Sequence, residues 1–206
     1  MLKTFYPMLQ PVYPLLVQQF VDDYQLTTGI ALDVGTGPGY LGLELAKITN
    51  MEVWFLDYSS EAIEKCKKNV LECELDNKLQ YFEADVADMP LESGSADFIM
   101  SRGSLWFWKE PVIGLKEISR ILKPGGTAFI GGGVGRYVPD TMRERLQKAN
   151  KEARKKRGDG PRPSLEDVRK WAEEAFDQEQ QIKYRVLSDD LEGKDGKWIE
   201  IKKDRS

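Results

Sequence analysis

The chain has 206 residues and a net charge of −4, with 41% hydrophobic and 31% charged residues. These proportions are typical of one globular domain with a full core, and no apolar run reaches the about 18 residues that a membrane span needs. Histidine is absent, which excludes histidine metal ligands and an imidazole general base. We expect a single domain over residues 1–206, with no metal site and no membrane span.

The two cysteines, Cys66 and Cys73, are too far apart for the C-x-x-C pattern of redox and metal sites. The N-terminal residues include early prolines and lack the small-residue cleavage site of a secretory signal. We therefore expect two reduced thiols in a cytoplasmic protein. The oligomeric state stays open.

Apolar spacing and turn residues predict an alternation of helices and strands. The expected elements, in chain order, are a helix over 14–24, a strand ending at 33, a helix over 39–48, a strand ending at 57, a helix from 59 or 60 to 71, strands over 79–83 and 96–101, a helix over 112–122, a strand over 127–130, helices over 141–157 and 164–176, and strands over 182–187 and 197–201. This alternation predicts a doubly wound, mostly parallel sheet. The last two strands have no helix between them, so one of them should be antiparallel.

The most informative segment is residues 31–41, ALDVGTGPGYL. It predicts a buried strand that reaches an acid, Asp33, and then passes through three alternating glycines into a helix. Glycines let the chain turn tightly and let a ligand approach the main chain closely. The helix should offer unpaired N–H groups and a positive dipole end to a small, partly anionic ligand. The spacing is G-x-G-x-G, whereas a dinucleotide loop needs its third glycine where Tyr40 stands.

Four further segments follow in order. Residues 51–57 (MEVWFLD) predict a second strand that ends in an acid, and residues 81–91 (YFEADVADMPL) place more acids after the third strand. Residues 96–101 (ADFIMS) and 121–127 (ILKPGGT) predict the fourth strand and the turn before the fifth. Ligands of open α/β sheets bind beyond the carboxyl ends of the strands, so these segments should meet in one crevice.

In this order, the five segments resemble the class I S-adenosylmethionine (SAM)-dependent methyltransferases over about residues 28–135. The likeness is to the small-molecule ("type 11") branch, similar to the ubiquinone and menaquinone methyltransferases. It implies SAM as cofactor, S-adenosylhomocysteine as product, and a Rossmann-like, doubly wound, seven-stranded, mostly parallel sheet with one antiparallel edge strand. Residues 1–27 would form an N-terminal helical cap, 28–135 the cofactor-binding core, 136–178 a helical insertion and 179–206 a terminal strand pair.

The resemblance also implies roles for single residues. Asp57 would hold the ribose hydroxyls, and Asp85 with the backbone N–H of Val86 would meet the adenine. The glycine loop would lie under the methionine portion, with Asp33 acting on its amino group through water or backbone and the Ser101 main chain also reaching it. The full set of cofactor-binding residues that the resemblance implies is Asp33, Gly35, Thr36, Gly37, Gly39, Asp57, Tyr58, Asp85, Val86 and Ser101.

Residues 101–108 (SRGSLWFW) are where the methyl acceptor is expected. They lack the Asn/Asp-Pro-Pro-aromatic motif of amino-methylating enzymes and the cysteine nucleophile of base C5-methylation. Aromatic residues stand where many small-molecule relatives carry two histidines, so no particular substrate follows. The catalytic residues stay unassigned, with Arg102, Tyr13 and Trp106 as candidates, because arginine holds anions and aromatic faces stabilise cations. A surface ion pair and helix packing are the alternative interpretations.

The motifs favour SAM-dependent methyl transfer to a small molecule by in-line displacement, which needs alignment and exclusion of water rather than a histidine. Residues 136–162 hold ten lysines or arginines against four acids, which is typical of a solvated helix face or of a surface that recruits an anion. An RNA or protein methyltransferase using this segment, disfavoured by the missing motifs, and a SAM-binding module without turnover stay as alternatives. A nicotinamide dehydrogenase is disfavoured by the glycine spacing.

Overall fold

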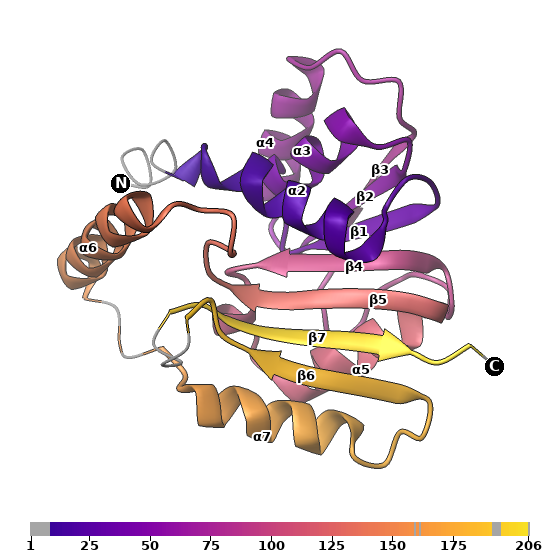
Figure 1. Cartoon of the computed structure of the whole chain (residues 1–206). Coiled ribbons are helices and arrows are strands. Elements are labelled where there is room, and N and C mark those ends of the chain that lie inside the picture. Colours follow the sequence, from indigo (N-terminus) through magenta and orange to yellow (C-terminus); the bar gives the residue numbers. More distant parts are fainter. Residues whose placement is uncertain (1–8, 159, 161, 191–194, 206) are drawn as a thin grey trace.

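The computed structural model describes residues 9–158, 160, 162–190 and 195–205. Within them, seven strands form one sheet in the order β3-β2-β1-β4-β5-β7-β6 (Figure 1). The strands are β1 Ile30–Val34, β2 Glu52–Asp57, β3 Leu79–Glu83, β4 Ala96–Arg102, β5 Leu122–Gly132, β6 Ile182–Leu187 and β7 Lys197–Lys203. Strands β1 to β5 pair in parallel, whereas β7 is antiparallel to both of its neighbours, β5 and β6.

The predicted α/β fold class, a doubly wound and mostly parallel sheet, is confirmed. The antiparallel strand is β7, which lies one position in from the edge because β6 pairs along its outer side. A short connection between consecutive strands permits only an antiparallel pair, while each parallel pair needs a crossover. Part of the connection between β6 and β7, residues 191–194, lies outside the described residues, as do residues 1–8 of the expected N-terminal cap.

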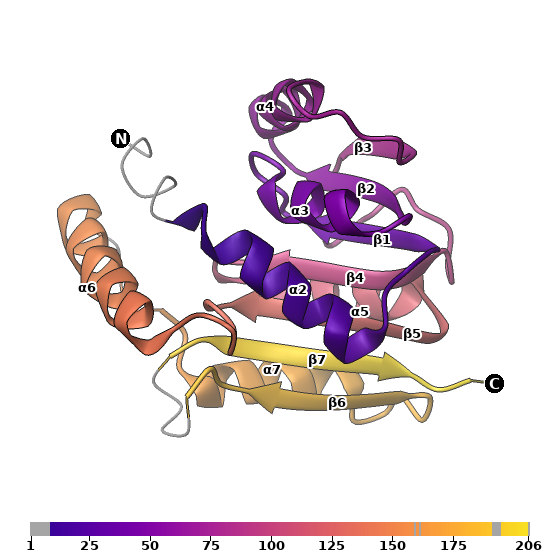
Figure 2. The ribbon, with the colours of Figure 1, turned by 45° about the horizontal axis from the view of Figure 1, so that its top comes forward.

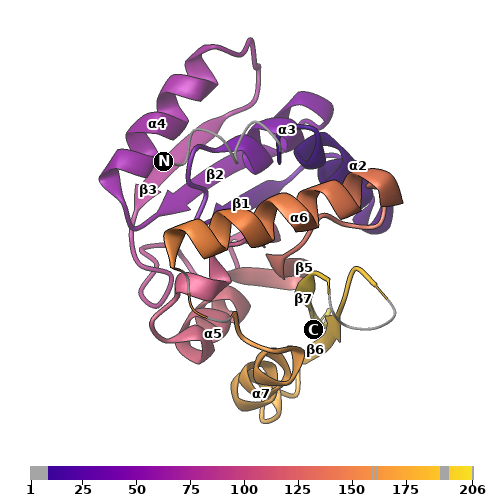
Figure 3. The same cartoon turned by 90° about the vertical axis from the view of Figure 1, so that its left-hand side faces the viewer.

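Helices cover both faces of the sheet (Figure 2). One face carries α2, α3 and α4, the other carries α5 and α7, and α6 stands across the carboxyl ends of the strands (Figure 3). The helices are α2 Val12–Tyr24, α3 Tyr40–Ile48, α4 Ser60–Leu71, α5 Pro111–Ile121, α6 Asp140–Arg157 and α7 Leu165–Phe176. None of these helices, in the described part of the chain, has the length and apolarity that crossing a bilayer requires.

Side chains that alternate along the central strand β4 pack into the apolar layers on both faces of the sheet. Phe98 packs against Phe20 of α2 with ring centroids 5.5 Å apart, while the next residue, Ile99, lies in the cluster formed with α5 and α7. Successive side chains of a strand point to opposite faces, so one strand contributes to two helical layers. All three residues are fully buried, and burying each such side chain stabilises the fold by roughly 1.5–3 kcal/mol.

Strand β5 is longer than the predicted strand over 127–130, and its first residue, Leu122, was expected to end the preceding helix. The helix stops at Ile121 instead, and Leu122 is extended, with φ −62° and ψ 132°. Pro124 is the physical reason, because proline cannot continue a helix and disfavours the helical conformation at the residue before it, Lys123, so that helices usually end at or before that residue. Leu122 then pairs with Ala96 of β4.

Candidate active site

The site residues gather where the strand order reverses, between β1 and its neighbour β4. Asp33 of β1 is only 2% exposed, and its Oδ2 accepts hydrogen bonds from the Thr36 hydroxyl at 2.7 Å and from the Gly42 N–H at 3.1 Å. The carboxyl group therefore ties the strand to the first turn of α3. Burial raises the pKa of Asp33 to about 7, although these two hydrogen bonds oppose the shift.

The glycine loop after β1 consists of residues 35–39. Gly35, Gly37 and Gly39 all have positive φ angles, of 65°, 54° and 81°. A side chain at Gly35 would collide with Ser104, and one at Gly39 with the Cys66 thiol, so close packing requires glycine at both positions. A side chain at Gly37 would meet no protein atom, so the middle of the loop presents bare backbone to open space.

The N–H groups of the loop itself, at residues 35, 36, 37 and 39, are paired within the protein. Gly35 and Thr36 both donate to the Leu56 carbonyl, at 2.7 and 3.0 Å. Gly37 donates to Asp57, and Gly39 donates to the Thr36 carbonyl at 3.0 Å. The loop is therefore unlike a pyrophosphate cradle, in which backbone N–H groups point at the anion.

Asp57 ends β2 beside this loop and is 7% exposed. Its Oδ2 accepts the Gly37 N–H at 2.9 Å, and its Oδ1 accepts the Ser59 N–H at 3.0 Å. An ionised carboxylate has about four acceptor positions, so both oxygens keep one for a hydroxyl donor. The neighbouring Tyr58 is 76% exposed and covers nothing in the described structure.

Asp85 and Val86 follow β3, the neighbour of β2. The carboxylate of Asp85 is exposed, and its Oδ1 accepts the Ala87 N–H at 2.9 Å, which shapes the turn. Val86 is buried against the α5 layer. The turn thus holds an exposed carboxylate and a fixed backbone beyond the strand end.

Ser104, which the sequence did not indicate, joins the two central strands. It contacts the hydroxyl of Ser101, donates to the Val34 carbonyl at 3.2 Å and accepts the Trp108 indole N–H at 3.1 Å. Ser101 is 1% exposed and points into this network. Ser104 also lies against Gly35, so the end of β4 is packed directly on the glycine loop.

A pocket of about 520 Å³ opens at the carboxyl ends of β4 and β5, beneath α6. Two of the candidate catalytic residues, Arg102 and Trp106, line it, whereas Tyr13 lies behind Arg102. The Arg102 guanidinium is 5.3 Å from the Tyr13 ring centroid, and its Nε donates to the Gly133 carbonyl at 2.9 Å. The structure therefore places two of the three candidates in the lining of one cavity, with Tyr13 outside the lining and against Arg102.

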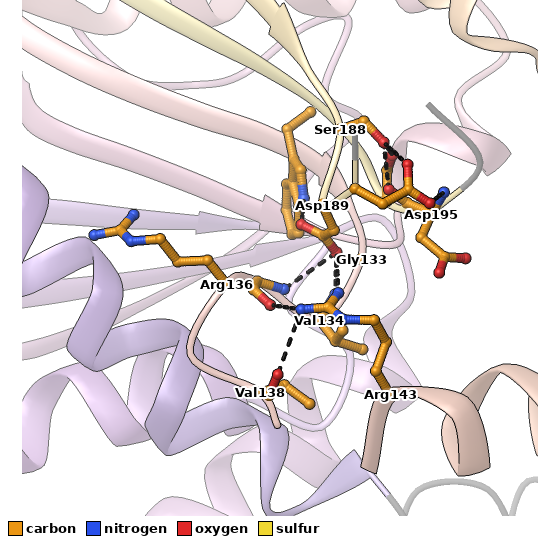
Figure 4. Close-up of polar contacts among 12 residues, drawn as sticks. Gly133, Val134, Arg136, Val138, Arg143, Ser188, Asp189 and Asp195 are labelled. Carbon is orange, nitrogen blue, oxygen red and sulfur yellow. Dashed lines mark hydrogen bonds and ion pairs between the residues drawn. The ribbon is translucent and has the colours of Figure 1, made fainter. Parts of the chain in front are cut away.

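The far wall of the pocket comes from α6 and from the turn between β6 and β7. Arg143 of α6 reaches toward Asp189, which follows β6 (Figure 4). Asp189 accepts the Val134 N–H at 2.7 Å and the Gly135 N–H at 3.2 Å. Sequence reasoning singled out the basic segment that contains Arg143 but did not place it at the pocket, because only the tertiary fold lays α6 across the strand ends.

An open α/β sheet with a glycine loop after β1, a buried acid after β2 and an exposed acid after β3 defines a protein that binds a nucleoside-containing cofactor. Residues 32–130 match a family model described as a methyltransferase domain. The crystal structure of a Methanococcus maripaludis protein, described as a SAM-dependent methyltransferase, aligns with a TM-score of 0.82 and 30% identity, covering 100% of this chain and 90% of that one. The chain belongs to the SAM-dependent methyltransferase family, for which SAM is the cofactor.

The core is also similar to curated plant and bacterial enzymes. The chain is 35% identical over 104 residues to 2-methyl-6-phytyl-1,4-hydroquinone methyltransferase 1 of Oryza sativa subsp. japonica. The aligned part covers 50% of this chain and 30% of the relative. The chain is 33% identical over 104 residues to the ubiquinone/menaquinone biosynthesis C-methyltransferase of Geotalea daltonii. The aligned part covers 50% of this chain and 44% of that relative. The chain thus spans less than half the length of these curated relatives.

Proposed function

We propose that this chain transfers a methyl group from SAM to a small molecule held in the pocket beneath α6. The proposal depends on one observation, which is that the pocket adjoins the glycine loop. Gly103 lines the pocket, and the next residue, Ser104, packs on Gly35. The volume of about 520 Å³ falls in the range of small-molecule sites.

The residues around the glycine loop fit SAM better than a dinucleotide. The bare backbone at Gly37 leaves room for the methionine portion, and the paired N–H groups of the loop offer nothing to a pyrophosphate. The acceptor positions left on Asp57 suit two ribose hydroxyls. The exposed Asp85 carboxylate suits the adenine amino group, with the Val86 N–H on a ring nitrogen. Asp33, Thr36, Gly39, Tyr58 and Ser101 complete the proposed cofactor site.

When bound, SAM supplies a methyl carbon that its sulfonium already activates. The glycine loop, Asp57 and Asp85 would hold SAM, which would supply the methyl group for an in-line displacement with S-adenosylhomocysteine as the leaving group. The chain's part is to align the acceptor and to exclude water. Arg102, fixed by the Gly133 carbonyl and the Tyr13 ring, is placed to orient the acceptor at the pocket rim.

The first test is calorimetric titration of the protein with SAM, S-adenosylhomocysteine and NADH. We expect both SAM-type ligands to bind and NADH not to bind. Failure of the SAM-type ligands to bind would overturn the proposal.

The second test uses SAM with a labelled methyl group and three classes of acceptor: a panel of small molecules, tRNA and protein. We expect label in small molecules only. Transfer into tRNA or protein would favour a macromolecular methyltransferase. SAM binding with no transfer to any class would favour a binding module without turnover.

A further inference from the structure

We propose that the pocket beneath α6 holds its ligand by an oxyanion, so that the methyl acceptor is a small molecule carrying a carboxylate or a phosphate. This inference rests on the proposed function and adds the chemical class of the substrate. It depends on three observations: the charge of the lining, the hydrogen-bonding groups that the lining leaves unused, and the size and position of the cavity.

The described lining is strongly cationic. Three elements contribute positive side chains: the end of β4, the inner side of α6 with the segment after it, and the start of β7. The lysines and arginines of the lining are Arg102, Arg143, Lys151, Arg154, Arg162 and Lys197. Against these six stand two aspartates, Asp189 and Asp195. Four apolar side chains, Leu9, Trp106, Val134 and Leu146, also line the pocket, and the cations beside them favour an acceptor that carries a negative charge.

The more buried aspartate is engaged by the protein itself. Asp189 has a side chain only 5% exposed and accepts the N–H groups of Val134 and Gly135 and the indole N–H of Trp198. The nearest Arg143 nitrogen, Nη1, lies 3.8 Å from Asp189 Oδ2, which is an ion-pair distance but too long for a hydrogen bond (Figure 4). The pocket therefore keeps an excess of positive charge.

Several buried donors in this lining have no hydrogen-bond partner among the described residues. They are Nη1 of Arg143, Nε of Arg154 and the indole Nε1 of Trp106, and the lining also holds one unpaired acceptor, Oδ1 of Asn150. A buried donor left unpaired costs roughly 1–3 kcal/mol, and donors outnumber the acceptor here, which favours a ligand that accepts hydrogen bonds. The oxygens of a carboxylate or phosphate are acceptors that pair well with guanidinium groups.

The cations also act on one another. Burial lowers the pKa of Lys197, and the positive charges of Arg162 and Arg154 lower it further, against the opposing effect of Asp195. Lys197 is thus held in a cluster of like charges that an anionic ligand would relieve. This repulsion follows from the same cationic lining and agrees with a negative ligand.

The position of the cavity favours a small anion over a nucleic acid. Arg102 and Gly103 place its inner wall beside the cofactor loop, and α6 covers it from outside. Other cations of α6, Lys148, Lys155 and Lys156, are exposed and take no part in the lining. A polyanion would bind through such exposed lysines, whereas a small oxyanion would bind through the lining.

Binding of inorganic phosphate and of malonate, measured at constant ionic strength, tests the proposal. We expect each of Arg154→Gln and Lys197→Gln to weaken anion binding by about tenfold, with thermal unfolding checked to show that the variants fold. The matched controls Lys148→Gln and Lys155→Gln should leave anion binding unchanged. Tighter binding of phosphate or of malonate identifies which oxyanion the acceptor carries.

Three results would overturn the proposal. The first is that the wild-type protein binds neither anion. The second is that the control variants lose as much anion affinity as the lining variants. The third is that the protein binds tRNA and that lining and control variants weaken this binding equally. SAM affinity is measured in parallel with all four variants. If the wild-type protein does not bind SAM, the proposed function is wrong. If it binds SAM but binds neither anion, only the proposal that the acceptor carries an oxyanion is wrong.

Discussion

The backbone N–H of Gly37 donates to the Asp57 carboxylate across 2.9 Å, so the loop after β1 and the acid after β2 form one hydrogen-bonded unit. The same loop is held from the other side by the Leu56 carbonyl, which accepts from Gly35 and Thr36. The shape of the loop therefore depends on the neighbouring strand as much as on its own glycines. A change in Asp57 should alter both the proposed ribose site and the loop.

Asp57→Asn should weaken SAM binding by at least about tenfold, because a charge-assisted hydrogen bond is worth roughly 1.5–3 kcal/mol. Calorimetric titration measures the change. Asp88→Asn is the control, since Asp88 is an exposed acid in the turn after β3. Equal SAM affinity in the Asp57 variant and the wild-type protein would remove Asp57 from the cofactor site.

Gly37→Ala should abolish SAM binding while the protein stays folded. Its φ of 54° costs alanine about 1 kcal/mol, and the added methyl meets open space in the protein alone. Gly94→Ala is a matched control, with a φ of 66° and equally open surroundings far from the loop. Both variants should lose similar stability in urea unfolding. SAM binding that survives in the Gly37 variant would place the cofactor elsewhere.

The stability of the protein should fall with rising pH because of Asp33. Burial holds its pKa near 7, above the ordinary value of 3.8, so the folded state binds this proton more tightly than the unfolded state. Protonation of Asp33 adds up to about 4 kcal/mol to the free energy of unfolding. This stabilisation is fully present below about pH 4 and is lost as the pH rises through about 7. Urea unfolding at pH 5 and pH 8 measures it. Asp33→Asn should remove most of the difference, and an equal pH dependence in both proteins would contradict the assignment.

Ser164→Ala should destabilise the fold by about 1 kcal/mol through loss of the helix cap. Ser164 accepts the Asp167 N–H at 3.0 Å, and the Asp167 carboxylate accepts the Ser164 N–H at 2.7 Å. Thermal unfolding should show a lower Tm for this variant, while Ser164→Thr, which keeps the hydroxyl as acceptor and as donor to the Asp167 carboxylate, should stay near the wild-type value. A Tm unchanged by the alanine would mean that the first turn of α7 gains little from its cap.

The framework of the fold follows from local patterns. The strand over 79–83 and the capping box at Ser164 are found where the sequence predicts them, because period-two apolar residues and capping side chains act over a few positions. Helix α5 ends one residue before the predicted end, because Pro124 disfavours the helical conformation at the residue that precedes it. The position of β7 between β5 and β6 depends on pairing between strands that are distant in the sequence, which no local pattern specifies.

The candidate site was predictable in part. The glycines and the acids at the strand ends stand out in the sequence, but the pairing of the loop N–H groups depends on Leu56 and Asp57 of another strand. The pocket was not predictable, because Arg143 and Asp189 are far apart in sequence and meet only when α6 crosses the strand ends. The basic composition of that segment was the available signal.

The place of β7 between β5 and β6 imposes an order of assembly during synthesis. In the described sheet β6 has β7 as its sole neighbour, although the ribosome makes β6 first. The emerging chain can complete five strands, but β6 must wait until β7 inserts beside β5. Lys197 begins β7, and Asp189 follows β6. The crevice at the ends of β1, β2 and β4 can therefore form before β7 is made, whereas the pocket beneath α6 is completed only when β7 joins the sheet.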